Sequence, residues 1–271
     1  MTRCSLLPGL LDYIVSFLRR DKRALCQCCL VSKPWVPRAR KHLFALVQFR
    51  SPDDIDKWKK TFPDSSSSPV RYTRTLMLNC FEVVTAADAA EAGWIPTFSG
   101  VVHLYLDNFL TSIPSHSEIS LTPFYKFSST LKQLFVASSV LPRLRVFNLI
   151  YSLPLLEDLS LIGDDTSTDD GESDESRAVV PPHASPKFTG ILQLLLFGGM
   201  AASTRQLVRA PRGIHFRIVK LSWSKEEDLR SIEELIVVCS ATLEHLDITH
   251  QVKGRTYSLH SFARPLTSIY R

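Results

Sequence analysis

The sequence lacks the residue patterns that mark common catalytic and metal centres. Its eight histidines are scattered, without an H-x-x-x-H or H-E-x-x-H pair, and no second C-x-x-C accompanies Cys26 to Cys29. It has no G-x-S-x-G nucleophile elbow, no phosphate-binding glycine loop and no dinucleotide fingerprint. We therefore expect a protein that is not an enzyme, with no catalytic residue, no metal and no cofactor.

Long apolar runs are missing as well. No stretch reaches the roughly 18 apolar residues that a membrane helix needs, and no N-x-S/T glycosylation site occurs. The apolar segment from Leu6 to Leu18 is interrupted by Asp12 and lacks the cleavage site of a signal peptide. We interpret the six cysteines as small apolar residues in a reducing compartment. We expect a soluble intracellular protein, cytoplasmic and/or nuclear, that binds no membrane.

Positive charge is concentrated at the N-terminus. The formal net charge is +5, but residues 1–50 hold ten Lys and Arg against only Asp12 and Asp21. A basic segment favours an acidic partner. Nucleic-acid binding needs a basic stripe along one helix face, whereas the cluster at Arg19–Arg23 falls between helices, so we expect no nucleic-acid partner.

The first 45 residues predict three short helices. Pro8 suits a first helical turn, and the apolar residues after it recur at helical spacing: Leu11, Ile14, Val15 and Leu18. A polar break over Arg19–Arg23 separates this helix from a second over Ala24–Cys29. A third begins near Leu30. Because proline costs about 3 kcal/mol in a helix interior, the regular part of the third helix should start around Pro37.

The string "LPGLLDYIVSFL…ALCQCCLVSKPWVPRARKHLF" resembles the F-box, in the form common in mushroom-forming fungi. The resemblance implies docking on the Skp-type adaptor of a cullin–RING ubiquitin ligase. The residues that would make this contact are Leu7, Pro8, Leu11, Ile14, Leu18, Leu30, Val31 and Trp35. A unit of this size buries little surface of its own, and its positive charge suits an acidic adaptor. Alternatively, these residues pack against the second domain of the same chain.

After the segment "PDSSSSP", short strand-like segments recur, each with two apolar residues at alternating positions. The pairs are Leu76/Leu78, Leu104/Leu106, Leu134/Val136, Leu159/Leu161, Leu194/Leu196, Val219/Leu221 and Leu246/Ile248. Their spacing of 25 to 35 residues and the L-x-x-L-x-L pattern at Leu131, Leu156 and Leu243 resemble a divergent leucine-rich repeat. The predicted organisation is a helical domain over 1–48, a linker over 49–70 and a solenoid over 71–271.

Helices should separate the strands. Thr85–Ala92 is rich in alanine, Leu141–Leu153 has helical spacing, and Lys225–Val238 has an apolar stripe with Glu226, Glu227 and Asp228 at its N-terminus. The run "DDTSTDDGESDES" has seven acidic residues and no apolar one, which predicts a disordered loop over 164–186. This loop is either a solvated spacer or a segment that phosphorylation regulates.

A parallel solenoid would present the residues between the paired apolar positions on its concave face. We expect substrate contacts from Tyr105, Asp107, Phe135, Ser160, Lys220, Ser222 and Asp247, with Met77, Asn79 and Thr249 on the same face. Aromatic residues dominate interface energies, so Tyr105 and Phe135 are the best anchors. Each of these positions can also be an ordinary surface residue.

The expected fold class is α/β: a three-helix F-box-like unit followed by a leucine-rich-repeat solenoid with a parallel sheet. The region "FTGILQLLLFGGM…APRGIHFRIVKLSW…CSATLEHLDI" also resembles the body of fungal F-box proteins with leucine-rich repeats. The family implies a substrate-recognition adaptor of a Skp–cullin–F-box ligase, whose partners are the Skp-type adaptor with its cullin complex and an unknown protein substrate. The alternative is an interaction scaffold outside any ligase, with the helical head acting only as a cap on the solenoid.

Overall fold

In the part of the chain that the structure describes, three short helices precede a row of nine strands. The structure, a computed structural model, describes residues 8–63, 68–79, 94–95, 97–107, 121–137, 143–163, 186–196, 200–223, 225–226, 228–252 and 255–262. The helices are α1 (Pro8–Phe17), α2 (Lys22–Val31), α3 (Val36–Leu43), α4 (Pro52–Thr61), α5 (Arg143–Tyr151), α6 (Ala201–Val208) and α7 (Asp228–Cys239). The strands are β1 (Leu46–Phe49), β2 (Thr75–Leu78), β3 (His103–Asp107), β4 (Gln133–Ala137), β5 (Asp158–Gly163), β6 (Ile191–Leu196), β7 (Ile218–Trp223), β8 (His245–Val252) and β9 (Arg255–Phe262). Short 3₁₀ helices are η1 (Lys33–Trp35), η2 (Pro69–Tyr72) and η6 (Thr122–Ser129).

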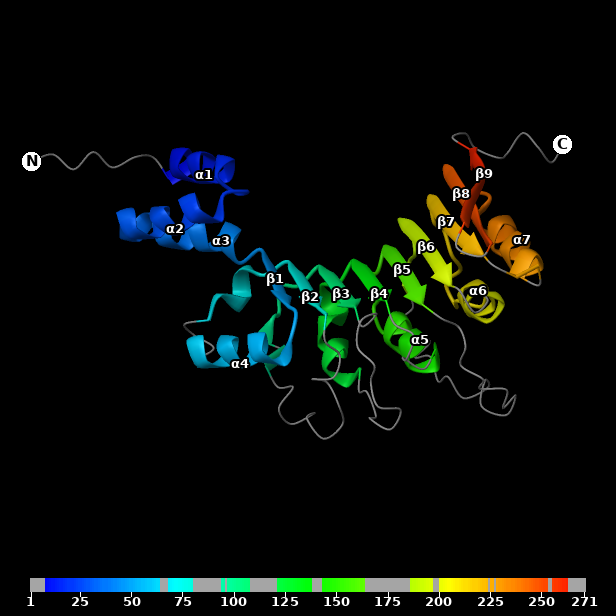
Figure 1. Cartoon of the computed structure of the whole chain (residues 1–271), viewed down its shortest axis with the longest axis horizontal. Coiled ribbons are helices and arrows are strands. Elements are labelled where there is room, and N and C mark those ends of the chain that lie inside the picture. The colour runs from blue at the N-terminus through cyan, green and yellow to red at the C-terminus, as the bar shows by residue number, and fades with distance from the viewer. Residues whose placement is uncertain are drawn as a thin grey trace, which may run out of the picture.

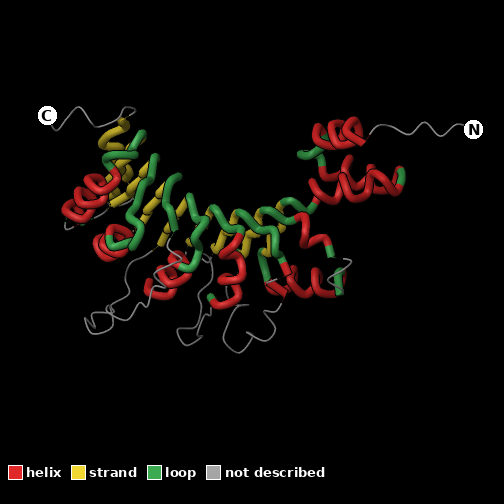
Figure 2. The backbone as a smooth tube through the Cα atoms, turned by 180° about the vertical axis from the view of Figure 1, so that it is seen from behind, coloured by secondary structure: helices red, strands yellow, loops and turns green. Residues whose placement is uncertain are grey.

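All nine strands form one sheet in chain order. Strands β1 to β8 are parallel, and β9 returns antiparallel along β8. The sheet bends into an arc, with α4, α5, α6 and α7 on its outer side (Figure 1 and Figure 2). This confirms the α/β class and the parallel sheet predicted from the sequence.

Two rows of apolar side chains run across the parallel strands on the side that the helices cover. The first row is Val47, Leu76, Leu104, Leu134, Leu159, Leu192, Val219 and Leu246. The second row is Phe49, Leu78, Leu106, Val136, Leu161, Leu194, Leu221 and Ile248. Every predicted pair lies on its strand, but the register of β6 differs by two residues from the prediction, since Leu192 and Leu194, not Leu194 and Leu196, pair with Leu159 and Leu161. Alternating leucines at 192, 194 and 196 fit two registers, which explains the error.

A repeated hydrogen-bond pattern fixes the start of the strands. The carbonyl of Ala45 accepts the N–H groups of both Arg74 and Thr75, each at 2.9 Å. The same pattern recurs at the start of most later strands, where one carbonyl accepts the N–H groups of two consecutive residues. These carbonyls belong to Arg74, Val102, Lys132, Gly190 and Arg217. Between β5 and β6, where the acidic insertion falls, the Asp158 carboxylate accepts the N–H of Ile191 at 2.7 Å instead. The strand-to-strand unit is therefore a true structural repeat.

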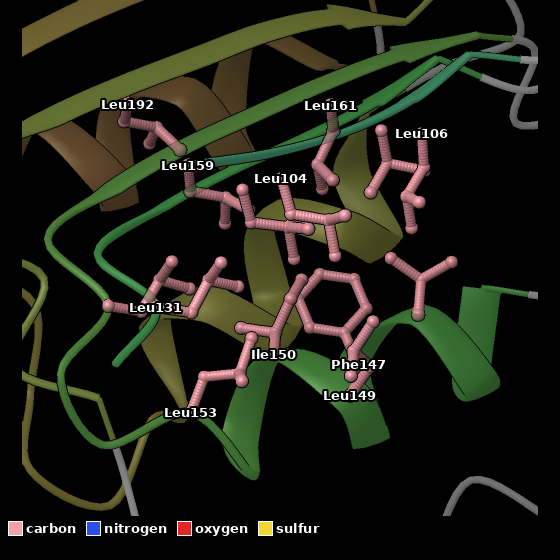
Figure 3. Packing of buried hydrophobic residues seen from close by; sticks show 14 of the residues in the cluster. Leu104, Leu106, Leu131, Phe147, Leu149, Ile150, Leu153, Leu159, Leu161 and Leu192 are labelled. Atoms are coloured by element: carbon pink, nitrogen blue, oxygen red, sulfur yellow. The ribbon is translucent and has the colours of Figure 1, made fainter. Parts of the chain in front are cut away.

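The main core lies between the sheet and the helical layer. Phe147, Leu149 and Ile150 of α5 point toward the leucines of β3 to β6 (Figure 3). The first leucine of each L-x-x-L-x-L pattern, at 131, 156 and 243, is buried in this core. Parallel strands covered by helices bury their alternating apolar residues efficiently, so this layer supplies most of the fold's hydrophobic stabilisation.

Residues 49–70, which we expected to be a linker, contain α4 and η2, and residues 46–48, which we had placed in the helical domain, belong to β1. Strand β1 joins the sheet at its N-terminal edge, and α4 follows it with Ile55 buried in the main core. Pro52 fits the first turn of α4, and Asp53 and Asp54 favour its N-terminal dipole. The sheet thus begins one strand earlier than the leucine pattern indicated, because β1 carries Val47 and Phe49 in place of leucines.

Two of the three predicted interstrand helices are confirmed, as α5 and α7. The third, Thr85–Ala92, and the acidic segment 164–185 lie outside the described residues. At the far edge of the sheet, β9 pairs antiparallel with β8.

Helices α1 to α3, which we call the head, have a small core of their own. It contains Val15, Leu25, Cys28 and Ala39, with Leu18, Cys29, Trp35 and Leu43 packed against it, and it is separate from the main core. Arg38 ties the head together: its Nε lies 2.9 Å from Asp12 and its Nη1 donates to the carbonyl of Pro34. As predicted, the regular part of the third helix starts near Pro37, which lies in the first turn of α3. Pro34 lies in the short 3₁₀ helix η1 that precedes it.

Candidate protein-interaction surfaces

The head exposes a set of large apolar side chains. On α1, Leu10, Tyr13 and Phe17 are 44%, 62% and 69% exposed, at spacings of three and four residues that put them on one helix face. The rings of Tyr13 and Phe17 meet edge to face, with centroids 4.7 Å apart. At the end of α2, Leu30 and Val31 are 79% and 67% exposed. A monomeric protein rarely leaves so many large apolar side chains exposed on one small unit, which marks the head as a contact surface.

The predicted adaptor-binding residues divide between the surface and the interior of the head. Leu30 and Val31 are exposed, whereas Leu11 is buried, and Leu18 and Trp35 pack on the head's core. Ile14 is half-buried. Leu7 lies outside the described residues; Pro8 begins α1, and nothing is described of its side chain.

Sequence reasoning missed the exposed face of α1. It treated Leu11, Ile14 and Leu18 as the docking stripe, but Leu11 is buried, Ile14 is half-buried and Leu18 packs on the head's core. The second stripe of α1, at 10, 13 and 17, had the same helical spacing and was available in the sequence. The head's surplus apolar residues do not pack on the sheet domain, since Leu30, Val31 and the exposed α1 residues remain open to solvent.

The head also carries exposed positive charge. Arg19 and Arg20 are exposed between α1 and α2, and Arg23 is exposed in the first turn of α2. Burial lowers the pKa of His42, and the nearby charges of Lys41 and Arg19 lower it further, so this imidazole stays neutral at physiological pH. Burial likewise raises the pKa of the Cys29 thiol, helped by its cysteine neighbour Cys26, which keeps the thiol protonated and unreactive.

The concave face of the sheet carries a second candidate surface. Its central row, in register across the parallel strands, is Gln48, Met77, Tyr105, Phe135, Ser160, Gln193, Lys220 and Asp247. The ring centroids of Tyr105 and Phe135 lie 5.5 Å apart, so these two predicted anchors form one aromatic contact between neighbouring strands. Gln48 and Gln193 belong to the row but had not been predicted.

A second row on this face is more apolar than expected. In register it holds Asp107, Ala137, Ile162, Leu195, Ser222 and Thr249. Ile162 and Leu195 extend the aromatic pair into an apolar centre, whereas Ser222 is only 3% exposed and so has little surface to offer a substrate. Asn79 follows β2, and the amide of Gln48 donates to it at 3.3 Å. The surface therefore has an apolar middle with Lys220 and Asp247 toward the β8 end.

Groups able to perform chemistry do not gather in the part of the chain that the structure describes. There, no three His, Cys, Asp or Glu side chains lie close enough to hold a metal ion. Burial raises the pKa of Tyr151 to about 12 and that of Cys239 to about 11, and both side chains are buried in the main core. None of the described helices is long and apolar enough to cross a membrane.

Two comparisons with known proteins identify no relative of this chain. Neither a scan against protein-family models nor a search of the curated proteins finds a match for this chain. The two surfaces are therefore the basis on which a function is proposed.

The aromatic contact on the concave face can be tested directly. Because Tyr105 and Phe135 pack across neighbouring strands, a double-mutant cycle with Tyr105→Ala and Phe135→Ala should give a coupling energy of about 0.5–1.5 kcal/mol. Urea unfolding of the four proteins measures it. A matched cycle with Tyr105→Ala and Lys220→Ala, four strands apart, should show no coupling. Equal coupling in both cycles would contradict the assigned contact.

Proposed function

We propose that this protein is the substrate-recognition subunit of a Skp–cullin–F-box type ubiquitin ligase, acting inside the cell. The head binds the Skp-type adaptor, and the concave face of the sheet binds a protein substrate. The chain itself performs no chemistry, since the transfer of ubiquitin takes place on other subunits of such a complex. In this proposal the head is an F-box-like domain and the sheet domain a divergent leucine-rich-repeat solenoid.

One observation carries the proposal. The head has its own small core yet keeps Leu10, Tyr13, Phe17, Leu30 and Val31 exposed. Apolar side chains at the centre of an interface, surrounded by charges that complement the partner, are the arrangement of a stable protein contact. The basic residues between α1 and α2 suit an acidic adaptor, in agreement with the sequence resemblance.

A second candidate is a scaffold outside any ligase, in which the head caps the sheet. It is favoured by the direct passage from α3, ending at Leu43, into β1, which begins at Leu46, and by the packing of α3 near η2. In that case the head would protect the N-terminal end of the sheet and need no adaptor.

Co-purification separates the two candidates. The intact chain, co-expressed with a Skp-type adaptor, should elute with it as a one-to-one complex in size-exclusion chromatography. The matched control is the intact chain carrying Leu30→Glu and Val31→Glu, which should elute alone while keeping its far-UV circular dichroism. Separate elution of the unchanged chain and the adaptor would refute the ligase proposal and favour the scaffold.

A further inference from the structure

The first strand of the sheet has an open edge. The carbonyls of Ala45 and Phe49 accept N–H groups from the β2 side, at Thr75 and Asn79. Backbone groups alternate in direction along a strand, so the N–H and C=O groups of Leu46 and Gln48 face away from β2. The next N–H on that side, of Arg50, is bound by the Asp54 carboxylate at 3.0 Å. The groups of Leu46 and Gln48 are thus placed to pair with an added strand.

A groove of about 560 Å³ runs along this edge. The whole of β1 and Arg50 line it, together with the end of α3 and one face of α4. Its apolar wall is aromatic: Trp58 lies 4.8 Å from Phe62 and 6.1 Å from Phe44, measured between ring centroids. All three rings are half-buried, so part of their apolar surface stays free to contact the side chains of a ligand.

The rim of the groove is positively charged. Lys22, Arg50 and Lys57 line it, and all three side chains are exposed. Among the described residues that line it, the one acidic side chain, Asp54, already accepts the N–H of Arg50. The charge therefore favours an acidic occupant, and the aromatic wall favours one that also carries apolar side chains.

We propose that this groove binds an extended acidic peptide of a partner protein, which adds to the sheet as a strand beside β1. Its backbone pairs with Leu46 and Gln48, its alternate apolar side chains pack on Trp58 and Phe62, and its carboxylates face Lys22, Arg50 and Lys57. This site differs from the exposed face of the head, and it shares only Gln48 with the central row of the concave face.

Two other occupants fit the groove less well. A second copy of the chain, paired edge to edge, would bring two identical basic rims together. The chain's own acidic segment, residues 164–176, matches the charge but contains no apolar residue to fill the aromatic wall.

The test uses the full chain and a fluorescent heptapeptide of alternating glutamate and apolar residues, Glu-Val-Glu-Phe-Glu-Val-Glu. The peptide should bind, and the same peptide with lysine in place of glutamate should not. Gln48→Pro removes the N–H that faces the open edge, at a position where an edge strand tolerates proline, and should weaken binding at least about tenfold. Gln48→Ala, which keeps this N–H, is the matched control and should bind within about twofold of the unchanged chain.

Lys57→Glu, on the exposed side of α4, tests the charge of the rim and should weaken binding at least about tenfold at low salt. Circular dichroism and the urea midpoint show that each variant is folded. Absence of binding at millimolar peptide, or equal loss in Gln48→Pro and Gln48→Ala, would overturn the proposal. So would a concentration-dependent dimer that Gln48→Pro abolishes, or peptide binding that tightens tenfold when the acidic residues of 164–176 are made neutral.

Discussion

A chain carrying both Tyr13→Glu and Phe17→Glu should bind a Skp-type adaptor at least about 100-fold more weakly than the unchanged chain, with the same urea unfolding midpoint. Both side chains are more than 60% exposed on α1, and their rings contact one another. Aromatic side chains that become buried at the centre of an interface contribute about 2 kcal/mol or more each. Replacing them with charged groups removes that contribution and adds the cost of desolvating two carboxylates.

Isothermal titration calorimetry with purified adaptor measures this loss. The matched control carries Tyr125→Glu and Val237→Glu, two exposed apolar positions of the sheet domain, and should bind within about twofold of the unchanged chain. Unchanged affinity in the folded Tyr13/Phe17 variant would show that α1 does not contact the adaptor. A lowered unfolding midpoint in that variant would show instead that the two rings stabilise the head.

Asp228→Ala should lower the free energy of unfolding by about 2–4 kcal/mol. The Asp228 side chain is 1% exposed, and its Oδ1 accepts the N–H groups of Met200 at 2.7 Å and Ala201 at 3.1 Å. These groups begin α6, which has no capping side chain from its own residues. The carboxylate therefore both satisfies two N–H groups and interacts with the positive end of the α6 dipole, and alanine leaves those groups without an acceptor.

Urea denaturation followed by circular dichroism gives this difference. Asp228→Asn keeps an oxygen acceptor and loses the charge, so it should cost about half as much as the alanine variant. Glu233→Ala removes an exposed carboxylate from the same helix, α7, and should change stability by less than about 0.5 kcal/mol. A cost below 0.5 kcal/mol for Asp228→Ala would contradict the assigned role.

The repeat could be predicted from sequence because its signal is local. Alternating leucines specify a strand and the face that it buries, and this placed seven of the parallel strands, from β2 to β8. β1 escaped notice because Val47 and Phe49 lack the leucine pattern. The β6 register was misplaced because three alternating leucines leave it undetermined within the strand, and only pairing with β5 decides it.

The surfaces were harder to predict because burial depends on neighbouring elements. In α1, the residues at 11, 14 and 18 and those at 10, 13 and 17 have similar spacing, and only the packing of α2 and α3 determines which set is covered. Asp228 illustrates the same point. Its place in the first turn of α7 suggested an interaction with that helix's own dipole, whereas its carboxylate caps the preceding helix, α6.

Each strand of this sheet positions the next, because two consecutive N–H groups at the start of most strands donate to one carbonyl immediately before the preceding strand. Because synthesis begins at the N-terminus, each strand would be complete before the next strand, which pairs with it, is made. Folding could then advance during synthesis in steps of one repeat, without waiting for distant parts of the sequence. The long acidic insertion would delay only the step from β5 to β6, where the Asp158 side chain holds the new strand.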